Sequence, residues 1–417
     1  MTLHPIISAL RKHKAGVVLI ALQIALTLAI VCNAIFIIGQ RVHTMSQPTG
    51  LDESDLFIAS QLWVGVPTSD SPADVARLDA LQKEDLAALR KMPDVVSVTP
   101  TNSLPLFSSS WTGSAGIKPG NGEYDGFSKG TALLAYYFTD EQALSTLGVK
   151  LVEGRFFRAD EVINIGSQEP RRPDVIVITA ALAKQLFPGE SALGKPLYLD
   201  GGTAPIRVIG IVDRLQAPSS VRRYAWNSAL IPARLDSRFS RYVIRVRPGR
   251  LAAAMKAVPG VLYGVNPMRV LDDENIQSFS QIRSRAYESD MGMAGVMAFV
   301  CLILLGVTAA GIVGLTSFWV SQRNRQIGVR RALGARRIDI LRYFQMENLV
   351  IASSGAVLGI VMAVTLNFVL MRFFDMDRLP MAWVWIAVGV VLVLSQAAVY
   401  VPARRASRIS PLAATRA

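Results

Sequence analysis

Four long apolar runs, none of which contains a charged residue, constrain this chain of 417 residues more than any other feature. Each run has at least the ~20 residues that a helix needs to cross the ~30 Å hydrocarbon core of a bilayer. Hydrophobic residues make up 51% of the chain and charged residues only 18%, which indicates a membrane protein. We therefore predict transmembrane helices at Ala15–Gly39, about Met291–Val320, Asn348–Met371 and Met381–Ala403.

Positive charge is concentrated next to these runs. Residues 1–14, 322–346 and 404–417 together carry a net charge of +13, which equals that of the whole chain. Lys and Arg beside a span stay on the cytoplasmic side, so this excess predicts a topology and does not indicate a nucleic-acid surface. The charged residues of these three segments are Arg11, Lys12 and Lys14, then Arg323, Arg325, Arg330, Arg331, Arg336, Arg337 and Arg342 with Asp339, and finally Arg404, Arg405, Arg408 and Arg416.

This charge distribution places both termini inside the cell. We predict cytoplasmic segments at 1–14, 321–347 and 404–417, a large outer domain at 40–290 and a short outer loop at 372–380. The first run has a basic flank, as a secretion signal does, but it exceeds the usual length of roughly 7–15 apolar residues and no small-x-small cleavage site follows. We interpret this run as an uncleaved anchor.

The basic segment between the second and third runs has a helical pattern. Val329, Ala332 and Leu333 share one face of that helix, while Arg330 and Arg331 point the other way. Gly334 follows, where a helix commonly ends, and a second helix is expected from about Arg337. A cytosolic protein could bind the apolar face as a helix in a groove. The composition alone is equally compatible with a topology signal whose arginines bind anionic lipid.

The outer domain alternates strand-like and helix-like segments in two separate places. The order strand, helix, strand occurs twice on either side of a Gly-, Ser- and Pro-rich segment at about 101–235, which predicts a split ferredoxin-like sheet with a β-rich insertion. A helix at about 274–290 should continue into the second span as a stalk. The segments expected are strand 55–63, helix 73–92 and strand 95–98, then strand 242–246, helix 250–258 and strand 261–270.

Residues that carry chemistry are sparse. Cys32 and Cys301 both lie in predicted spans, and the three histidines near the amino terminus form no set with them, so we expect no disulfide and no metal site. The stretch Gly189–Lys195 matches the start of a phosphate-binding loop, but Pro196 stands where Ser or Thr must hold magnesium. No catalytic residue is predicted. Since the spans contain no ionisable side chain, the chain lacks the groups with which a pump harvests an ion gradient.

Small residues recur in the second and third runs. In the third run, Gly355 and Gly359 form a G-x-x-x-G pattern that permits close helix packing. The sequence leaves open whether the partner helix belongs to the same chain or to a second protomer.

The basic segment resembles the cytoplasmic loop of the MacB-type, FtsX-like ABC transporter permeases, in which R-x-E-I-G-I-R-R-A-L-G-A precedes D-I and an acid at the start of the next span. The matching stretch is Arg325–Ala335, followed by Asp339, Ile340 and Glu347, with Gln326 in place of the usual acid. The outer domain resembles MacB-like periplasmic core domains in short sequence segments such as Glu153-Gly154-Arg155-Phe156-Phe157, Leu193-Gly194-Lys195 and Val208-Ile209-Gly210-Ile211-Val212. The tail Pro402–Pro411 is similar to the closing P-A-R-R-A-x-R-x-x-P of the family, although Ala413–Arg416 departs from its usual E-A-L-R.

The resemblance implies a permease subunit in the inner membrane of a bacterium, whose ATP is bound by a separate cytosolic ABC ATPase and not by a cofactor site in this chain. It also implies a permease dimer, with itself or with a sibling permease. Such systems export peptides, antibiotics or lipid-linked cargo, often through a periplasmic adaptor and an outer-membrane channel. The residues that the resemblance assigns to coupling with the ATPase are Ile327, Gly328, Val329, Arg330, Arg331, Ala332, Leu333, Gly334, Ala335, Asp339 and Glu347.

Two other functions fit the same sequence. Like FtsX itself, the chain could move no solute and relay ATP hydrolysis to an outer partner such as a cell-wall hydrolase. A membrane-anchored sensor without an ATPase is a third interpretation, which the structured loop and the four spans disfavour, since one or two spans would serve.

Overall fold

A computed structural model describes residues 14–66, 71–107, 109, 111–120, 130–166, 172–218, 224–271, 273–374 and 377–408. Predictions that concern Arg11, Lys12 and residues 413–416 lie outside this part of the chain. The chain divides into two compact units. Residues 1–46 and 289–417 form the helical unit, and residues 47–288 form the α+β unit.

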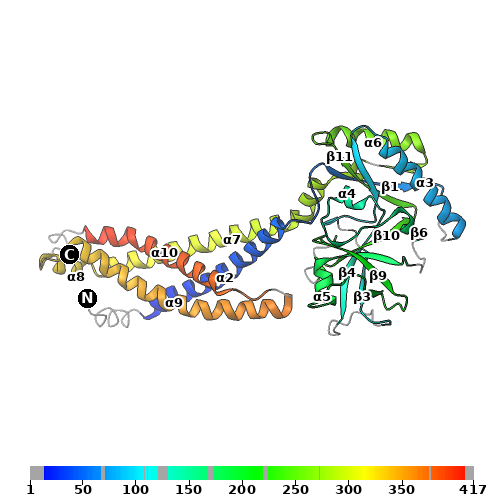
Figure 1. Cartoon of the computed structure of the whole chain (residues 1–417). Coiled ribbons are helices and arrows are strands. Elements are labelled where there is room, and N and C mark those ends of the chain that lie inside the picture. Colours follow the sequence, from blue (N-terminus) through cyan, green and yellow to red (C-terminus); the bar gives the residue numbers. More distant parts are fainter. Residues whose placement is uncertain are drawn as a thin grey trace. The chain divides into compact units, whose positions relative to one another are not determined.

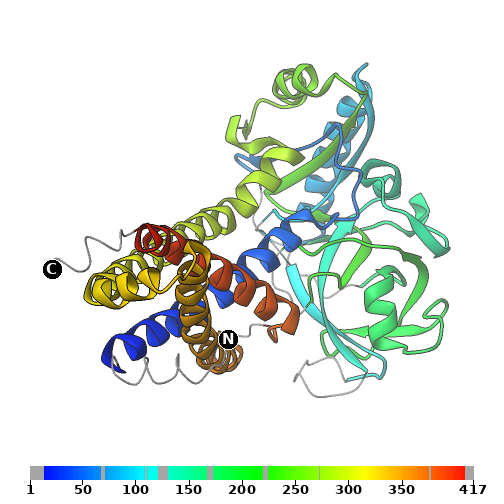
Figure 2. The same ribbon diagram turned by 90° about the vertical axis from the view of Figure 1, so that its left-hand side faces the viewer.

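The helical unit contains four helices that are long and apolar enough to cross a membrane. The helix α2 lies alongside both α9 and α10, which also pack against each other (Figure 1 and Figure 2). Together with the large α+β unit, these helices confirm the predicted fold class. The helices are α2 (Lys14–Ser46), α7 (Phe279–Gln322), α9 (Arg337–Phe374) and α10 (Met381–Ser407), with the short α8 (Asn324–Ala332) between α7 and α9.

Close packing between α2 and α9 depends on two glycines. A Cβ atom added at Gly355 would lie 2.7 Å from the carbonyl oxygen of Ala21, and one added at Gly359 would lie 3.0 Å from that of Ala25. The G-x-x-x-G pattern therefore packs against α2 of the same chain, which decides the alternative that the sequence left open. Nearby, Asn33 Nδ2 on α2 donates a hydrogen bond of 3.1 Å to the carbonyl of Ala363.

The α+β unit contains two sheets. In the first sheet, the strand order is β12-β1-β11-β2 with antiparallel pairs, and β13 also pairs with β1. The helices α3 and α6 pack on each other and share one core with the sheet. The first strands of the two strand–helix–strand halves, β1 and β11, therefore lie side by side in the centre, and the second strands, β2 and β12, lie at the edges. The elements are β1 (Leu56–Trp63), α3 (Pro72–Arg90), β2 (Val95–Pro100), β11 (Phe239–Val246), α6 (Leu251–Val265), β12 (Arg269–Val270) and β13 (Ile276–Ser278).

The second sheet is inserted between β2 and β11. Its strands pair in the order β4-β3-β8-β9-β7-β10, and β10 pairs again with β4, so these six strands close into a ring. The strands β5 and β6 extend it through β9 and β10. The stretch Gly189–Lys195 is a loop that leads into a strand, not into a helix. The elements are β3 (Trp111–Gly116), β4 (Thr131–Thr139), α4 (Ala143–Leu147), β5 (Leu151–Gly154), η1 (Ala159–Glu161), β6 (Ile163–Gly166), β7 (Val175–Thr179), α5 (Ala180–Leu186), β8 (Pro196–Leu199), β9 (Ile206–Val212) and β10 (Ser228–Asp236).

Two sequence predictions in the first sheet are wrong. The helix expected to end at Val258 runs through Pro259 to Val265, so the predicted strand 261–270 shrinks to the two residues of β12. The reason is the spacing of Ala254, Val258 and Leu262, which are all buried in the core of the first sheet. This burial offsets the backbone hydrogen bond that a proline removes from a helix.

The predicted stalk helix also begins later than expected. Residues 273–275 form a 3-10 turn, η3, and Ile276–Ser278 pair with β1, so α7 starts at Phe279 instead of near Glu274. Pairing of these residues with an existing sheet edge satisfies their backbone groups, and it overrides their helical pattern.

Candidate functional site

The helix α8 is shaped by local chemistry at both ends. It follows α7 at Arg323, whose amide donates to the carbonyl of Trp319 at 3.1 Å. At the other end Gly334 has a φ of +97°, and the amide of Ala335 donates back to the carbonyl of Arg330 at 3.1 Å. A left-handed residue closes a helix in this way, and glycine adopts it without steric cost. The predicted helix and its end at Gly334 are therefore confirmed.

One acidic residue of the loop, Asp339, lies in the first turn of α9 and caps the start of that helix. Asp339 Oδ2 accepts a hydrogen bond of 2.9 Å from the amide of Arg336, the residue before the helix. A carboxylate in the first turn that reaches back to the preceding amide stabilises a helix start. The structure thus gives Asp339 a capping role in α9.

One side of α8 is fixed to the long helices. Ile327 and Gly328 are buried, and Ile327 belongs to a core cluster with Ile340 and Phe344 of α9 and with small residues of α10. Arg331 Nη1 donates to the carbonyl of Ser407 on α10 at 2.6 Å. The guanidinium of Arg330 lies 5.0 Å from the ring centroid of Tyr343, a cation–π distance. These contacts hold α8 against both α9 and α10.

A buried ion pair adds a further link. Arg323 Nη1 lies 3.0 Å and 2.9 Å from the two carboxylate oxygens of Glu347, and Glu347 is only 2% exposed. Removing one partner would leave an uncompensated buried charge, so the pair fixes the start of α8 to α9. The resemblance pointed to Glu347 as a coupling residue, but the pairing with Arg323 was not predicted, although Glu347 is the one acid at the head of that span.

The opposite side of α8 is apolar and exposed. Leu333 is 83% exposed and Val329 is 49% exposed, and Ala332 is exposed beside them. A shallow groove of about 410 Å³ is lined by Arg325, Gln326, Val329 and Arg330. We call Val329, Ala332 and Leu333 the apolar face of α8. Apolar side chains flanked by arginines can bind an apolar groove that has an acidic rim.

The structure therefore separates the residues that the sequence grouped together. The apolar face points outward, whereas Ile327, Gly328, Arg331 and Glu347 hold the helix in place from behind. Among the described residues, no group of three or more His, Cys, Asp or Glu side chains is arranged to hold a metal ion.

Comparison with known proteins gives two matches that together cover most of the chain. Residues 18–259 match the profile of the MacB-like periplasmic core domain, and residues 298–411 match that of the FtsX-like permease C-terminal domain. In the solved structures, the periplasmic region of MacB from Actinobacillus actinomycetemcomitans is 16% identical with a TM-score of 0.34, and the match covers 58% of this chain and 97% of that one.

Two curated relatives extend over nearly the whole chain. The macrolide export ATP-binding/permease protein MacB of Bartonella henselae is 27% identical over 360 residues, which is 84% of this chain and 50% of that protein. The pyoverdine export ATP-binding/permease protein PvdT of Pseudomonas savastanoi pv. phaseolicola is 24% identical over 388 residues, which is 90% of this chain and 53% of that protein. The chain spans about half the length of these relatives. Because the first profile alone covers more than half of the chain, this multi-pass membrane protein belongs to the family of permeases that combine a MacB-like periplasmic core domain with an FtsX-like permease domain.

Proposed function

We propose that this chain is the membrane subunit of a MacB-type ABC transporter in the inner membrane of a bacterium. A separate cytosolic ABC ATPase binds and hydrolyses ATP, and α8 couples that ATPase to the spans. In this arrangement both termini and α8 lie in the cytoplasm and residues 47–288 lie in the periplasm, as the positive charge beside the spans favours. The names of the relatives, which describe export ATP-binding/permease proteins, support this assignment.

The observation that carries the proposal is the two-sided construction of α8. Its apolar face is open to a partner, while its other side is fixed to α9 and α10 by Ile327, Arg331 and the Arg323–Glu347 pair. A partner that moves this helix must also move the helices behind it, because the contacts are buried and include charged hydrogen bonds. A topology signal that only binds lipid has no need of such anchoring.

The helix α7 offers a route for that movement. It is one uninterrupted helix of 44 residues from Phe279 to Gln322, and it meets α8 at Arg323. ATP-driven closure of the ATPases would tilt α8, and the tilt would be transmitted along α7. A continuous hydrogen-bonded helix without proline resists bending, so a displacement at one end is not absorbed along its length.

The proposal includes a permease dimer, with a second copy or a sibling chain, and export of peptides, antibiotics or lipid-linked cargo through a periplasmic adaptor and an outer-membrane channel. The apolar surface of α7 is consistent with a dimer. Val296, Phe299 and Leu302 are between 64% and 67% exposed, and lipid or a second permease would cover them.

The double variant Val329→Asp with Leu333→Asp tests the coupling role. Two carboxylates on the apolar face would be desolvated by the partner, so we expect co-purification of the ATPase to fall by about tenfold or more. The matched control is Arg336→Gln with Arg337→Gln, which changes the net charge of the same loop by the same amount at exposed positions away from the apolar face. The control should retain the ATPase. If the double aspartate variant still binds the ATPase and still stimulates ATP hydrolysis, the docking proposal is wrong.

Transport itself is tested by reconstituting the chain with its cognate ATPase in vesicles. ATP-dependent movement of a peptide or antibiotic across the bilayer would support the exporter. The FtsX-like relay would be the better assignment if ATP hydrolysis is coupled to the chain and activates an outer partner, but no solute moves.

A further inference from the structure

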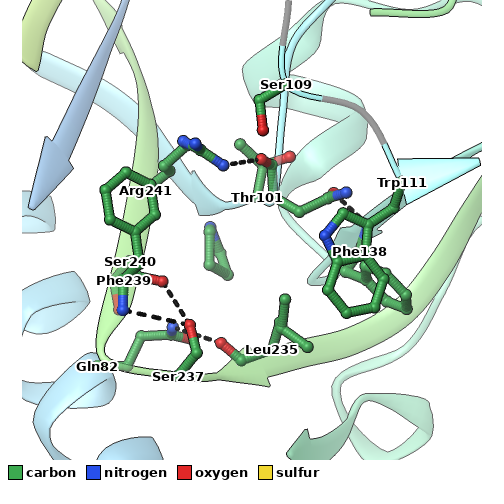
Figure 3. A pocket seen from close by; sticks show the side chains of 12 residues that line it. Gln82, Thr101, Ser109, Trp111, Phe138, Leu235, Ser237, Phe239, Ser240 and Arg241 are labelled. Atoms are coloured by element: carbon green, nitrogen blue, oxygen red, sulfur yellow. Dashed lines mark hydrogen bonds between the residues drawn. The ribbon is translucent and has the colours of Figure 1, made fainter. Parts of the chain in front are cut away.

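A cavity of about 280 Å³ lies inside the α+β unit, where its two sheets meet (Figure 3). Its walls include Phe239 and Arg241 on β11 of the first sheet and Trp111 and Phe138 on β3 and β4 of the second. Gln82 of α3 closes another side. Pockets for small molecules commonly measure ~300–1,000 Å³, so this cavity suits a ligand of about the size of one amino-acid residue.

Arg241 is the charged group of this cavity. Its Nη1 donates to the carbonyl oxygen of Asn102, and its Nε is buried with no hydrogen-bond partner in the described part of the chain. The guanidinium lies 4.3 Å from the ring centroid of Phe239 and 5.3 Å from that of Phe107. Burial lowers the pKa of Arg241 to about 10, so the side chain is still a cation at neutral pH. It pairs with no carboxylate among the described residues.

The other arginines of the α+β unit that are shielded from water are paired with carboxylates. Every other arginine of the α+β unit that the structure describes as buried or half-buried has a carboxylate oxygen within 3.0 Å. A cation that is shielded from water and has no anion is unfavourable, and here the fold leaves the half-buried Arg241 in that position beside a cavity. The paired arginines are Arg155, Arg234, Arg245, Arg269 and Arg283.

A second polar group in the wall also lacks a partner. Gln82 is 3% exposed and its Nε2 faces the carbonyl of Leu235 at 3.5 Å, whereas its Oε1 is buried and accepts no hydrogen bond from the described residues. The remaining walls are aromatic, since Trp111 and Phe138 pack edge to face with ring centroids 5.3 Å apart. Among the described residues, the cavity therefore combines a cation without an anion, an acceptor without a donor and aromatic walls on the opposite side (Figure 3).

We propose that this cavity binds a carboxylate carried on an aromatic or branched apolar group that also bears a hydrogen-bond donor, as in an N-acylated amino acid or the last residue of a peptide. The carboxylate pairs with Arg241, the apolar group packs on Trp111 and Phe138, and the Gln82 amide turns its Oε1 toward the cavity to accept from the donor. Charged hydrogen bonds to a guanidinium give this recognition its strength, and the aromatic walls select the apolar group. Such a ligand contacts both sheets and stabilises the folded unit by mass action.

The test is calorimetric titration of N-acetyl-L-phenylalanine into the full chain in lipid nanodiscs, with N-acetyl-L-phenylalaninamide as the matched ligand without a carboxylate. We expect saturable binding of the acid and a decrease of about tenfold or more for the amide, because a hydrogen bond to a charged group is lost. Arg241→Met should reduce binding of the acid by a similar factor. Arg207→Met, at an exposed position on β9, is the matched control and should bind as the unmodified chain does.

The carboxylate ligand could be a free small molecule or the carboxyl terminus of a peptide, and a peptide that ends in phenylalanine with a free carboxylate distinguishes the two. If the peptide and the acid both bind, the cavity accepts a chain terminus. If only the acid binds, the ligand is a free small molecule. Should Arg241→Met fail to fold, as judged by its thermal transition, Gln82→Leu takes its place and should weaken binding of the acid, because the N–H donor of the ligand loses its acceptor. Equal binding of acid and amide, unchanged binding by Arg241→Met, or no saturable binding up to millimolar acid would each overturn the proposal.

Discussion

The helical unit and the α+β unit bury polar side chains in different ways. Between the apolar spans, two buried contacts join neutral partners: the hydroxyls of Thr27 and Thr308 lie 2.8 Å apart, and Asn348 donates a hydrogen bond of 3.1 Å to the carbonyl of Ser395. In the α+β unit the side chains of Asp85 and Arg269 form an ion pair of 2.9 Å with no exposed surface.

The difference reflects the solvent around each unit. A charge at the depth of a bilayer is costly, so charged pairs of the helical unit lie near helix ends, as with Arg323 and Glu347. Without a hydrophobic force between helices in lipid, close approach at Gly355 and Gly359 brings α2 and α9 together. A water-facing unit folds around an apolar core, and it can keep an internal charge if every hydrogen bond is satisfied.

The sharpest test of this contrast is Asp85→Ala in the α+β unit. Asp85 accepts hydrogen bonds from Gln61, Tyr242 and both terminal nitrogens of Arg269 at 2.7 to 2.9 Å. Its removal leaves Arg269 as an uncompensated buried cation, which should cost about 3–5 kcal/mol in the free energy of unfolding. Thermal unfolding of the full chain, with hydrogen exchange in β1 and α3, measures this loss.

The matched control is Glu190→Ala, because the side chains of Glu190 and its partner Lys195 are 73% and 31% exposed and the pair lies at the surface. Exposed pairs contribute about 0–1 kcal/mol, so hydrogen exchange in β1 should hardly change. A similar loss in both variants would contradict the claim that burial makes the difference.

A smaller effect is expected from Gly355→Leu in the helical unit. The new side chain would meet the carbonyl of Ala21 at 2.7 Å and push α2 away from α9, which should cost about 1–3 kcal/mol. Resistance to denaturation in detergent measures it. Gly306→Leu on α7 is the control, since a Cβ there meets no described atom within 4 Å. Equal stability of both variants would show that the glycine contact is not needed.

The smallest effect concerns a half-exposed pair of the α+β unit. The guanidinium of Arg155 lowers the pKa of Glu161 to about 2 from its ordinary value of 4.5. The stability that this pair contributes is therefore present above about pH 4.5 and is lost as the pH falls toward 2. Solvent screening keeps it below about 1 kcal/mol.

Glu161→Gln removes this titration. The difference in unfolding midpoint between the unmodified chain and the variant should narrow as the pH is lowered from 5 through about 3, measured by denaturant titration at each pH. A difference that stays constant across this range would mean that the carboxylate does not contribute through its charge.

The features that could be predicted from sequence are those in which neighbouring residues decide the outcome. The four charge-free runs, the end of α8 at Gly334 and the start of α9 at Arg337 all depend on local chemistry, and each appears as expected. The first strand–helix–strand half, β1, α3 and β2, was visible for the same reason. The prediction failed at Pro259 and at residues 276–278, where contacts with a distant sheet overrode the local pattern.

The candidate site divides in the same way. The sequence by itself determined that an amphipathic helix would sit between two spans, because periodicity and a glycine are enough to specify it. Only the tertiary structure decided that Arg323 would pair with Glu347, that Arg331 would reach Ser407, and that Arg241 would lack an anion beside a cavity. Those outcomes depend on which segments, far apart along the chain, the two folded units bring into contact, and no local pattern of residues contains that information.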